Sequence, residues 1–258
     1  MRYLVAAHLR ERRRSVLAWG IPLGLWSAFI VAIFPSIEGT LSKLAKSYPP
    51  ALKEAFGVGE LANVEQYLQA EMLSLIVPLA LGYLAVRAVA SGLSGAAESG
   101  RLDVLLSAPV SRRSLAAASF AATGVELAAV LLVAVAFAGL GSLVSGAGLS
   151  LGSALAGFAN VWPLALLFAG LGIVATGWSL RTSVVTGSVA GVLVSMYVID
   201  LVGRLDPGLS GVRYLSVFKY YGNAIEDGIE PLAFCGTVVV AIGVAALGAW
   251  LFERRDLS

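Results

Sequence analysis

The longest uncharged stretch of the sequence limits the possible folds more than any other feature. Residues 127–180, a run of 54 positions, contain no acidic, basic or histidine residue. A helix crosses the hydrocarbon core of a bilayer with about 20 apolar residues, so one crossing uses less than half of this run. The chain must therefore turn back within it, and the Gly and Ser cluster at residues 139–152 marks the turn. The sequence predicts two adjacent membrane-spanning helices, at about residues 115–140 and 151–180.

The rest of the chain is also typical of a membrane protein. Charged residues make up 13% of the sequence and its mean hydropathy is +0.86, whereas a soluble domain carries about 25% charged residues. The first apolar segment is too long for the apolar part of a cleaved signal peptide and is expected to be retained. We predict an all-α integral membrane protein with one transmembrane domain over residues 1–258. Four further spans are expected at about residues 16–34, 72–93, 184–203 and 231–252.

The distribution of basic residues predicts the orientation. An excess of Lys and Arg in short loops marks the cytoplasmic side of a membrane. With the N-terminus inside, 12 of the 18 Lys and Arg residues fall on that side: Arg2, Arg10, Arg12, Arg13, Arg14, Arg87, Arg101, Arg112, Arg113, Arg181, Arg254 and Arg255. Both termini are therefore expected in the cytoplasm, and the multi-pass chain in the cytoplasmic membrane. The longer segments 35–70 and 204–230 then lie outside, where we expect short helices.

A polar-edged segment, residues 97–113, separates the second and third predicted spans. If residues 102–107 are helical, Leu102, Leu105 and Leu106 fall on one face. The polar residues Arg101, Asp103 and Ser107 then point elsewhere. A helix this short needs support from the membrane surface, from a partner protein, or from both. The segment is therefore a candidate docking site.

Several kinds of chemistry have no basis in the sequence. None of the four lysines follows a glycine, so the chain has no phosphate-binding G-x-x-x-x-G-K-[ST] loop. The only histidine, His8, lies in the basic N-terminal segment, which excludes a Ser-His-Asp arrangement or a histidine metal site within the membrane. We therefore predict that the chain is not an enzyme and binds no cofactor or metal itself.

One carboxyl group, Glu126, lies about halfway along the third predicted span. An ionisable side chain at this depth faces the protein interior or a water-filled cavity. Glu126 is interpreted either as a substrate-pathway or proton-carrying carboxyl, or as a carboxyl satisfied by Ser, Thr or backbone partners. Tyr220 and Tyr221, in the aromatic part of the outer segment 204–230, are the other candidates for a substrate pathway.

The segment between the second and third spans resembles the permease subunits of ABC-2 type transporters, which are ATP-binding cassette exporters. That family carries an acidic cluster followed by G-T-L-E-x-L-L-x-x-P-[VI]-S-R at this place. Asp103 stands for the usual Glu and Arg101 for the usual Thr. Residues 214–222 and 252–257 are similar to two further family stretches, L-S-P-F-x-Y-Y and F-x-R-R-D-L. The matching positions in the main motif are Glu98, Gly100, Leu102, Leu105, Leu106, Pro109, Val110, Ser111 and Arg112.

This resemblance implies a coupling helix at about residues 98–108 that docks into a separate ATP-binding subunit. Pro109 would end that helix and Ser111 would cap the next one. ATP and Mg would bind to the partner subunit, and two permease subunits would form a homodimer or heterodimer in the lipid bilayer. No nucleic-acid partner is expected. The partner-binding candidates are Glu98, Gly100, Leu102, Asp103, Leu105, Leu106, Pro109, Ser111 and Arg112.

The leading prediction is the permease subunit of an ATP-driven exporter. The few charges in its helices suit a hydrophobic or amphipathic cargo. Two alternatives remain open at the level of sequence. One is a non-transporting membrane anchor or immunity protein, and the other is an ion-gradient-driven transporter that uses Glu126.

Overall fold

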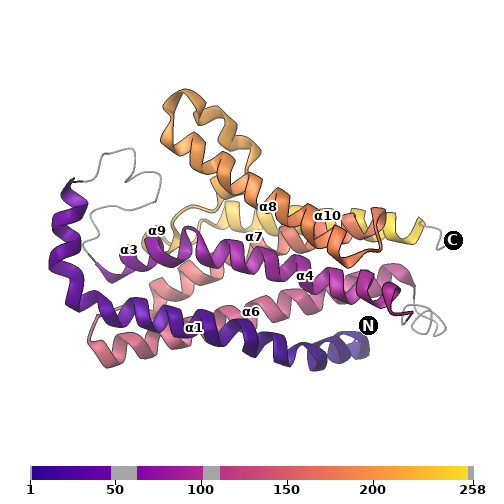
Figure 1. Ribbon diagram of the computed structural model, residues 1–258, viewed down its shortest axis with the longest axis horizontal. Helices are drawn as coiled ribbons and strands as arrows, with labels where there is room; N and C mark the ends of the chain where they lie inside the picture. Colours follow the sequence, from indigo (N-terminus) through magenta and orange to yellow (C-terminus); the bar gives the residue numbers. More distant parts are fainter. Residues whose placement is uncertain (1, 48–62, 101–110, 255–258) are drawn as a thin grey trace.

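The computed structural model is almost entirely helical (Figure 1). It describes residues 2–47, 63–100 and 111–254, with side chains at 12–40, 63–100 and 111–254. No strand occurs in these ranges. The prediction of an all-α membrane protein is confirmed, because six helical segments are long and apolar enough to span a membrane: Arg12–Thr40, Val64–Glu98, Arg112–Ser145, Leu151–Trp178, Thr182–Leu205 and Pro231–Arg254.

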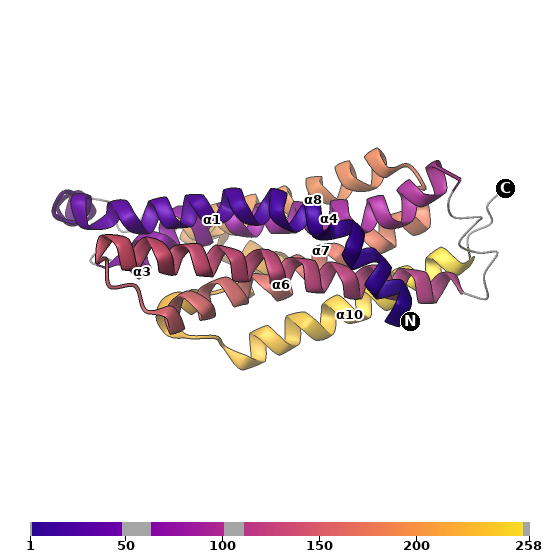
Figure 2. The ribbon, with the colours of Figure 1, turned by 90° about the horizontal axis from the view of Figure 1, so that it is seen from below.

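Six long helices and several short elements make up the bundle. The long helices are α1 (Arg2–Ser47), α4 (Ile76–Glu98), α6 (Arg112–Ser145), α7 (Leu151–Trp178), α8 (Thr182–Leu205) and α10 (Pro231–Arg254). Before α4 come α3 (Val64–Leu68) and a π-helical turn, η1 (Gln69–Leu73). Between α8 and α10 lie η2 (Pro207–Leu215), η3 (Val217–Tyr220) and α9 (Ala224–Asp227). Figure 2 shows that the N-terminus, the end of α10 and the ends of α4 and α6 next to residues 101–110 lie toward one end of the bundle.

The first helix extends beyond the predicted span at both ends. The basic N-terminal segment and residues 35–47 belong to the same helix, which contains Pro22 and Pro35. Proline is a common cause of sharp helix bends, and Figure 1 shows α1 bending strongly toward its C-terminal end. The segment that follows the first span, predicted to lie outside, therefore starts as a continuation of α1.

The turn between α6 and α7 is shorter than the Gly and Ser cluster suggested. α6 continues to Ser145 and is ended by Gly146, which adopts φ 71°, a conformation that favours glycine. Ser150 then caps α7 by accepting a hydrogen bond from the Ser153 backbone N–H at 3.3 Å. The glycines at 139 and 141 are not in the turn because they lie inside α6.

Small residues place α1 and α6 side by side. In three contacts along their length, each α1 residue meets the α6 residue 113 positions later in the chain, so the two helices run parallel. A Cβ atom on Gly141 would lie only 2.5 Å from the Ala28 carbonyl oxygen, which shows how closely the two backbones approach. Three small residues of α1, spaced four apart, face α6: Gly20 on Val133, Gly24 on Phe137 and Ala28 on Gly141.

A second close pair is formed by α7 and α10, which also run parallel. Gly170 of α7 approaches the backbone at Ala241 and Ala245, and Gly248 of α10 approaches Val174. A Cβ on Gly248 would lie 2.6 Å from the Val174 backbone nitrogen. Because both pairs depend on glycine, the bundle is held by close backbone packing, as is common where lipid supplies no hydrophobic driving force.

Candidate functional site

A buried ion pair joins three helices. Arg12 Nη1 lies 2.9 Å from Glu126 Oε2, and the two side chains are 10% and 1% exposed. The same nitrogen donates to Thr123 Oγ1 at 2.6 Å, and Nη2 donates to the Ala88 carbonyl at 2.8 Å. One guanidinium group of α1 is therefore bonded to both α6 and α4.

The parallel packing of α1 and α6 explains why these residues meet. Arg12 and Glu126 are 114 positions apart, which continues the offset seen at Gly20 and Gly24. Arg12 also follows the four-residue spacing of those glycines, so it lies on the same face of α1. The neighbouring Arg13 does not follow the spacing, and it is exposed.

The structure changes the interpretation of two residues. Glu126 lies inside the bundle with an arginine as its main partner, whereas the sequence suggested Ser, Thr or backbone groups. Arg12, one of the cations expected on the cytoplasmic side, is buried in the bundle. Arg12 belongs to the same four-residue series as Gly20 and Gly24, which places it on that face of α1 but does not identify its partner. A role of Glu126 in a substrate pathway stays a prediction.

Glu98 connects the end of α4 to the start of α8. Its carboxylate accepts hydrogen bonds from the Thr182 hydroxyl at 2.6 Å and from the Thr182 backbone N–H at 3.1 Å. Thr182 is the first residue of α8, where a negative charge is favoured by the free N–H groups and the helix dipole. Glu98, predicted to bind a partner protein, thus has an intramolecular contact, and its role in docking stays a prediction.

The other partner-binding candidates lie around the same end of the bundle. Gly100 adopts φ 68° just after α4. Ser111 caps α6, as predicted, by accepting from the Ser114 backbone N–H at 3.2 Å, and Arg112 is the first residue of that helix. Next to it, Arg113 forms an ion pair with Glu253 of α10. The remaining candidates lie outside the described residues: Leu102, Asp103, Leu105, Leu106 and Pro109.

The outer candidates, Tyr220 and Tyr221, line a narrow pocket between η3, α7 and α10 together with Asn160 and Phe234. Tyr221 is buried, its carbonyl accepts a hydrogen bond from Asn160 Nδ2, and burial raises the pKa of its hydroxyl. Tyr220 is half exposed. Glu126 is not part of this pocket. The structure therefore does not bring the three proposed substrate-pathway residues together in one site.

A second buried carboxylate, Asp200, lies near the C-terminal end of α8. It accepts from Arg204 Nε at 2.8 Å and from Arg213 Nε at 3.0 Å. Arg213 comes from η2 and crosses α8 at Gly203, where a Cβ atom would lie 2.4 Å from the arginine side chain. This cluster fixes η2 against α8. In the described side chains, no group of three or more His, Cys, Asp or Glu residues is arranged to hold a metal ion.

The fold and these contacts define a multi-pass helical membrane protein whose buried charges join its helices to one another. Comparison with known families adds the role of such a bundle. Residues 2–253 match the family described as "Multidrug efflux system permease Rv1217c, C-terminal domain", and the chain belongs to this family. The match covers all six spans, so the bundle as a whole is a transport permease. No curated protein matches the chain.

Proposed function

We propose that this chain is the transmembrane permease subunit of an ABC-2 type efflux transporter. A separate ATP-binding subunit would bind and hydrolyse ATP with Mg, and a second permease subunit would complete the pathway across the cytoplasmic membrane. The observation that carries the proposal is the family match over residues 2–253. The motif between α4 and α6, which resembles a coupling helix, supports it.

The contacts at this end of the bundle suit a transmission role. A movement of residues 101–110 acts directly on α4 and α6, because those helices flank the segment. The hydrogen bonds of Glu98 would transmit this movement from α4 to α8, and the Arg113–Glu253 pair would transmit it from α6 to α10. The contacts of Arg12 with α4 and α6 would transmit it to α1. Closure of two ATP-binding subunits would thus move the bundle as a connected body.

The proposed docking surface is the leucine face formed by Leu102, Leu105 and Leu106. Apolar side chains supply the buried centre of such an interface and charged residues its rim. Because Glu98 already caps α8, docking would depend more on the leucines than on this carboxylate. Both chain termini are proposed to lie in the cytoplasm, on the same side as this surface.

Co-expression with the candidate ATP-binding subunit tests the proposal. Leu105→Asp and Leu106→Asp would each prevent co-purification of that subunit and abolish substrate-stimulated ATPase activity in liposomes, while the permease remains inserted. Leu215→Asp is the matched control, since Leu215 is an exposed leucine of η2 at the outer face. If both cytoplasmic variants bound the ATPase and transported normally, the docking role would be wrong.

The same liposomes separate the two alternatives. A non-transporting anchor would bind its partner without substrate-stimulated ATP hydrolysis. A gradient-driven transporter would work without any ATPase and lose activity in Glu126→Gln. The Arg12 contacts give Glu126 a structural role, so the ABC permease remains the function that the observations favour.

A further inference from the structure

Two arginines share one buried carboxylate at the C-terminal end of α8. Arg204 Nε lies 2.8 Å from Asp200 Oδ2, and Arg213 Nε lies 3.0 Å from Asp200 Oδ1. Arg204 makes a second contact with Oδ2 through Nη2. Asp200 itself is 2% exposed. The three side chains therefore form a compact cluster with two positive charges and one negative charge.

Most of the hydrogen-bond donors in this cluster have no partner in the described part of the chain. An arginine side chain carries five N–H groups. Asp200 uses two of those of Arg204 and one of those of Arg213. Neither Nη1 of Arg204 nor the two Nη groups of Arg213 bond to a described residue. The arginine side chains are 21% and 24% exposed, so these donors can reach a ligand.

No second carboxylate among the described side chains balances the extra positive charge. Asp206, two positions after Arg204, is exposed and accepts a hydrogen bond from the Gly208 backbone N–H at 2.8 Å. It forms no ion pair with either arginine. The stem of Arg213 lies so close to Gly203 that a Cβ atom there would clash with it. The unbalanced charge is therefore held in a fixed position on α8.

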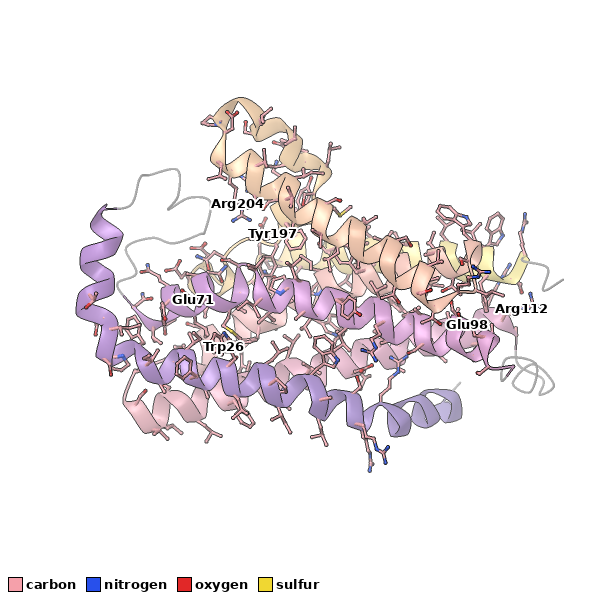
Figure 3. All side chains as sticks on the ribbon, viewed as in Figure 1. Trp26, Glu71, Glu98, Arg112, Tyr197 and Arg204 are labelled. Carbon is pink, nitrogen blue, oxygen red and sulfur yellow. The ribbon has the colours of Figure 1, made fainter. Side chains whose placement is uncertain are left out.

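The cluster lies where α8 reaches the level of the lipid headgroups. α8 starts beside Glu98, next to residues 101–110, so Arg204 in its last turn belongs to the opposite side of the bundle. The 24 residues of α8 extend over about 36 Å, which exceeds the hydrocarbon thickness of about 30 Å. Figure 3 shows Arg204 near this end of α8, where the helix projects from the side of the bundle.

The short helix η2 continues this exposed surface. None of its residues is buried, and its large apolar side chains Leu209, Tyr214 and Leu215 are exposed. Apolar side chains and a tyrosine on a short helix suit the boundary between headgroups and acyl chains. Arg213 of η2 therefore lies at the level of the lipid phosphates.

We propose that the cluster of Asp200, Arg204 and Arg213 binds the phosphate group of an anionic phospholipid. Guanidinium groups bind phosphate oxygens through paired N–H donors, and a negatively charged headgroup balances the extra positive charge. The acyl chains of this lipid lie in the bilayer beside α8, where Val198 and Val202 are exposed. The bound lipid holds the end of α8 and η2 at the headgroup level.

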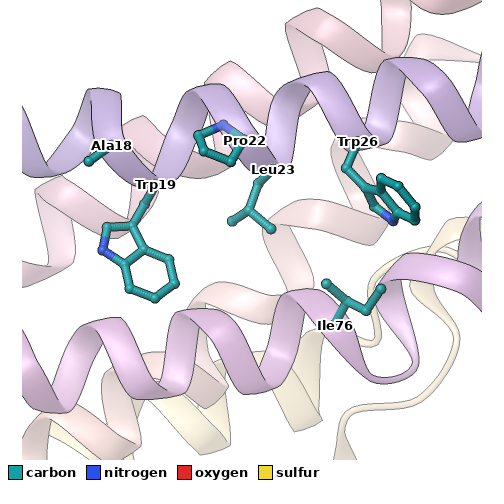
Figure 4. Close-up of a pocket in the computed structure, with 6 residues that line it drawn as sticks. All are labelled: Ala18, Trp19, Pro22, Leu23, Trp26 and Ile76. Atoms are coloured by element: carbon teal, nitrogen blue, oxygen red, sulfur yellow. The ribbon is translucent and has the colours of Figure 1, made fainter.

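The groove between α1 and α4 offers no such recognition. It has a volume of about 400 Å³, and none of its lining residues is charged (Figure 4). Acyl chains fill such a surface whatever headgroup they carry. Selectivity for an anionic headgroup should therefore depend on the arginines and not on the groove. The lining residues are Ala18, Trp19, Pro22, Leu23, Trp26 and Ile76.

Native mass spectrometry of the full chain in detergent, titrated with phosphatidylglycerol or phosphatidylcholine, tests this site. Both lipids carry a phosphate, but only phosphatidylglycerol has a net negative charge. Binding is measured without an ATP-binding subunit, so the result does not depend on the proposed transport function. We expect saturable binding of phosphatidylglycerol and about fivefold weaker binding of phosphatidylcholine.

Arg213→Gln leaves Arg204 paired with Asp200 and removes the unbalanced charge. It would weaken phosphatidylglycerol binding about fivefold, as expected for one arginine at a membrane surface, and would make the two lipids bind about equally. Arg213→Lys keeps the charge but not the paired donors, and would weaken binding about twofold. A purely structural role of Arg213 would weaken both lipids alike and leave their ratio unchanged.

Two control variants should keep the preference for phosphatidylglycerol. Arg181→Gln removes an exposed arginine at the other end of α8, so it makes the same change in charge away from the cluster. Trp26→Leu alters the apolar groove without changing any charge.

Four results would overturn the proposal. The first is equal binding of the two lipids by the unaltered chain. The second is an unchanged lipid ratio in Arg213→Gln, with the protein monodisperse. The third is displacement of phosphatidylglycerol by millimolar inorganic phosphate, which would make this a site for a free anion. The fourth is disulfide cross-linking in nanodiscs between two copies carrying Leu209→Cys in a Cys235→Ser background, which would show that a second copy covers this surface.

Discussion

The two buried carboxylates, Glu126 and Asp200, are both paired with arginine but join very different parts of the chain. The partner of Glu126 comes from another helix, 114 positions away, and also bonds to a third helix. The partners of Asp200 are four and 13 positions away. The first cluster therefore depends on assembly of α1, α4 and α6, whereas the second needs only the end of α8 and the adjoining η2.

Burial of the arginines also differs between the clusters. The Arg12 side chain is 10% exposed, while those of Arg204 and Arg213 are 21% and 24% exposed. Removing the partner of a charge that reaches water costs little stability, because water solvates the remaining charge. Removing the partner of an enclosed charge costs much more stability. The same kind of ion pair is therefore expected to hold helices together strongly at Glu126 and to stabilise only the local contact between η2 and α8 at Asp200.

The largest expected effect is on the Glu126 cluster. Arg12→Ala leaves a carboxylate enclosed without its cation, and we expect a loss of about 3–5 kcal/mol in the free energy of unfolding. Unfolding in mixed micelles, followed by circular dichroism, measures it. Arg13→Ala is the control because Arg13 is exposed. The double variant Arg12→Met with Glu126→Leu would recover most of the stability. Equal stability of Arg12→Ala and Arg13→Ala would contradict the expectation that the Arg12–Glu126 pair holds the helices together.

A smaller effect is expected where packing sets the alignment of that pair. Gly141→Ala places a methyl group against the Ala28 backbone, where a Cβ would lie 2.5 Å from the carbonyl oxygen. Separation of α1 from α6 would cost about 1–3 kcal/mol, measured by the same unfolding experiment. Gly187→Ala in α8 is the control, since a Cβ there meets no atom within 4 Å. Similar stability of the two variants would mean that the close approach is not required.

The local contact at Asp200 should respond more weakly still. Asp200→Asn removes the charge but keeps the shape, and the partly exposed arginines can turn to water. We expect a loss of about 1 kcal/mol. Limited proteolysis near residues 207–215 would increase, because η2 is released from α8. A loss as large as that of Arg12→Ala would remove the distinction between the two clusters.

The smallest effect concerns the link between α4 and α8. Thr182→Val removes the hydroxyl that donates to Glu98 and leaves the backbone N–H bond in place. We expect about 0.5 kcal/mol and faster hydrogen exchange of the first amides of α8. Thr186→Val, one turn later, should not change these amides. Unchanged exchange in Thr182→Val would show that the hydroxyl bond does not stabilise the start of α8.

The sequence predicts those parts of the structure that depend on short stretches. The number of membrane-spanning helices can be predicted from the lengths of the apolar runs. The capping role of Ser111 can be predicted because a serine directly before a helix is a common N-cap. The sequence did not predict that Gly141 lies within α6, because glycine is common both in turns and where helices approach closely.

The Arg12–Glu126 contact was missed for another reason. Such a pair depends on which helices are neighbours and on how they are aligned, and no local pattern states this. The Asp200–Arg204 pair, four positions apart, is a type that helical spacing does indicate. The predicted coupling helix lies outside the described residues and stays a prediction.

The parallel alignment of α1 and α6 limits how the two helices can slide. A slip by one helical turn would place Arg12 opposite Ala122 or Val130 instead of Glu126 and would break the ion pair. The Arg12–Glu126 ion pair thus opposes sliding of α1 along α6. During any conformational change, α1 and α6 would move together as one rigid body. Relative motion would then have to occur at other helix–helix interfaces.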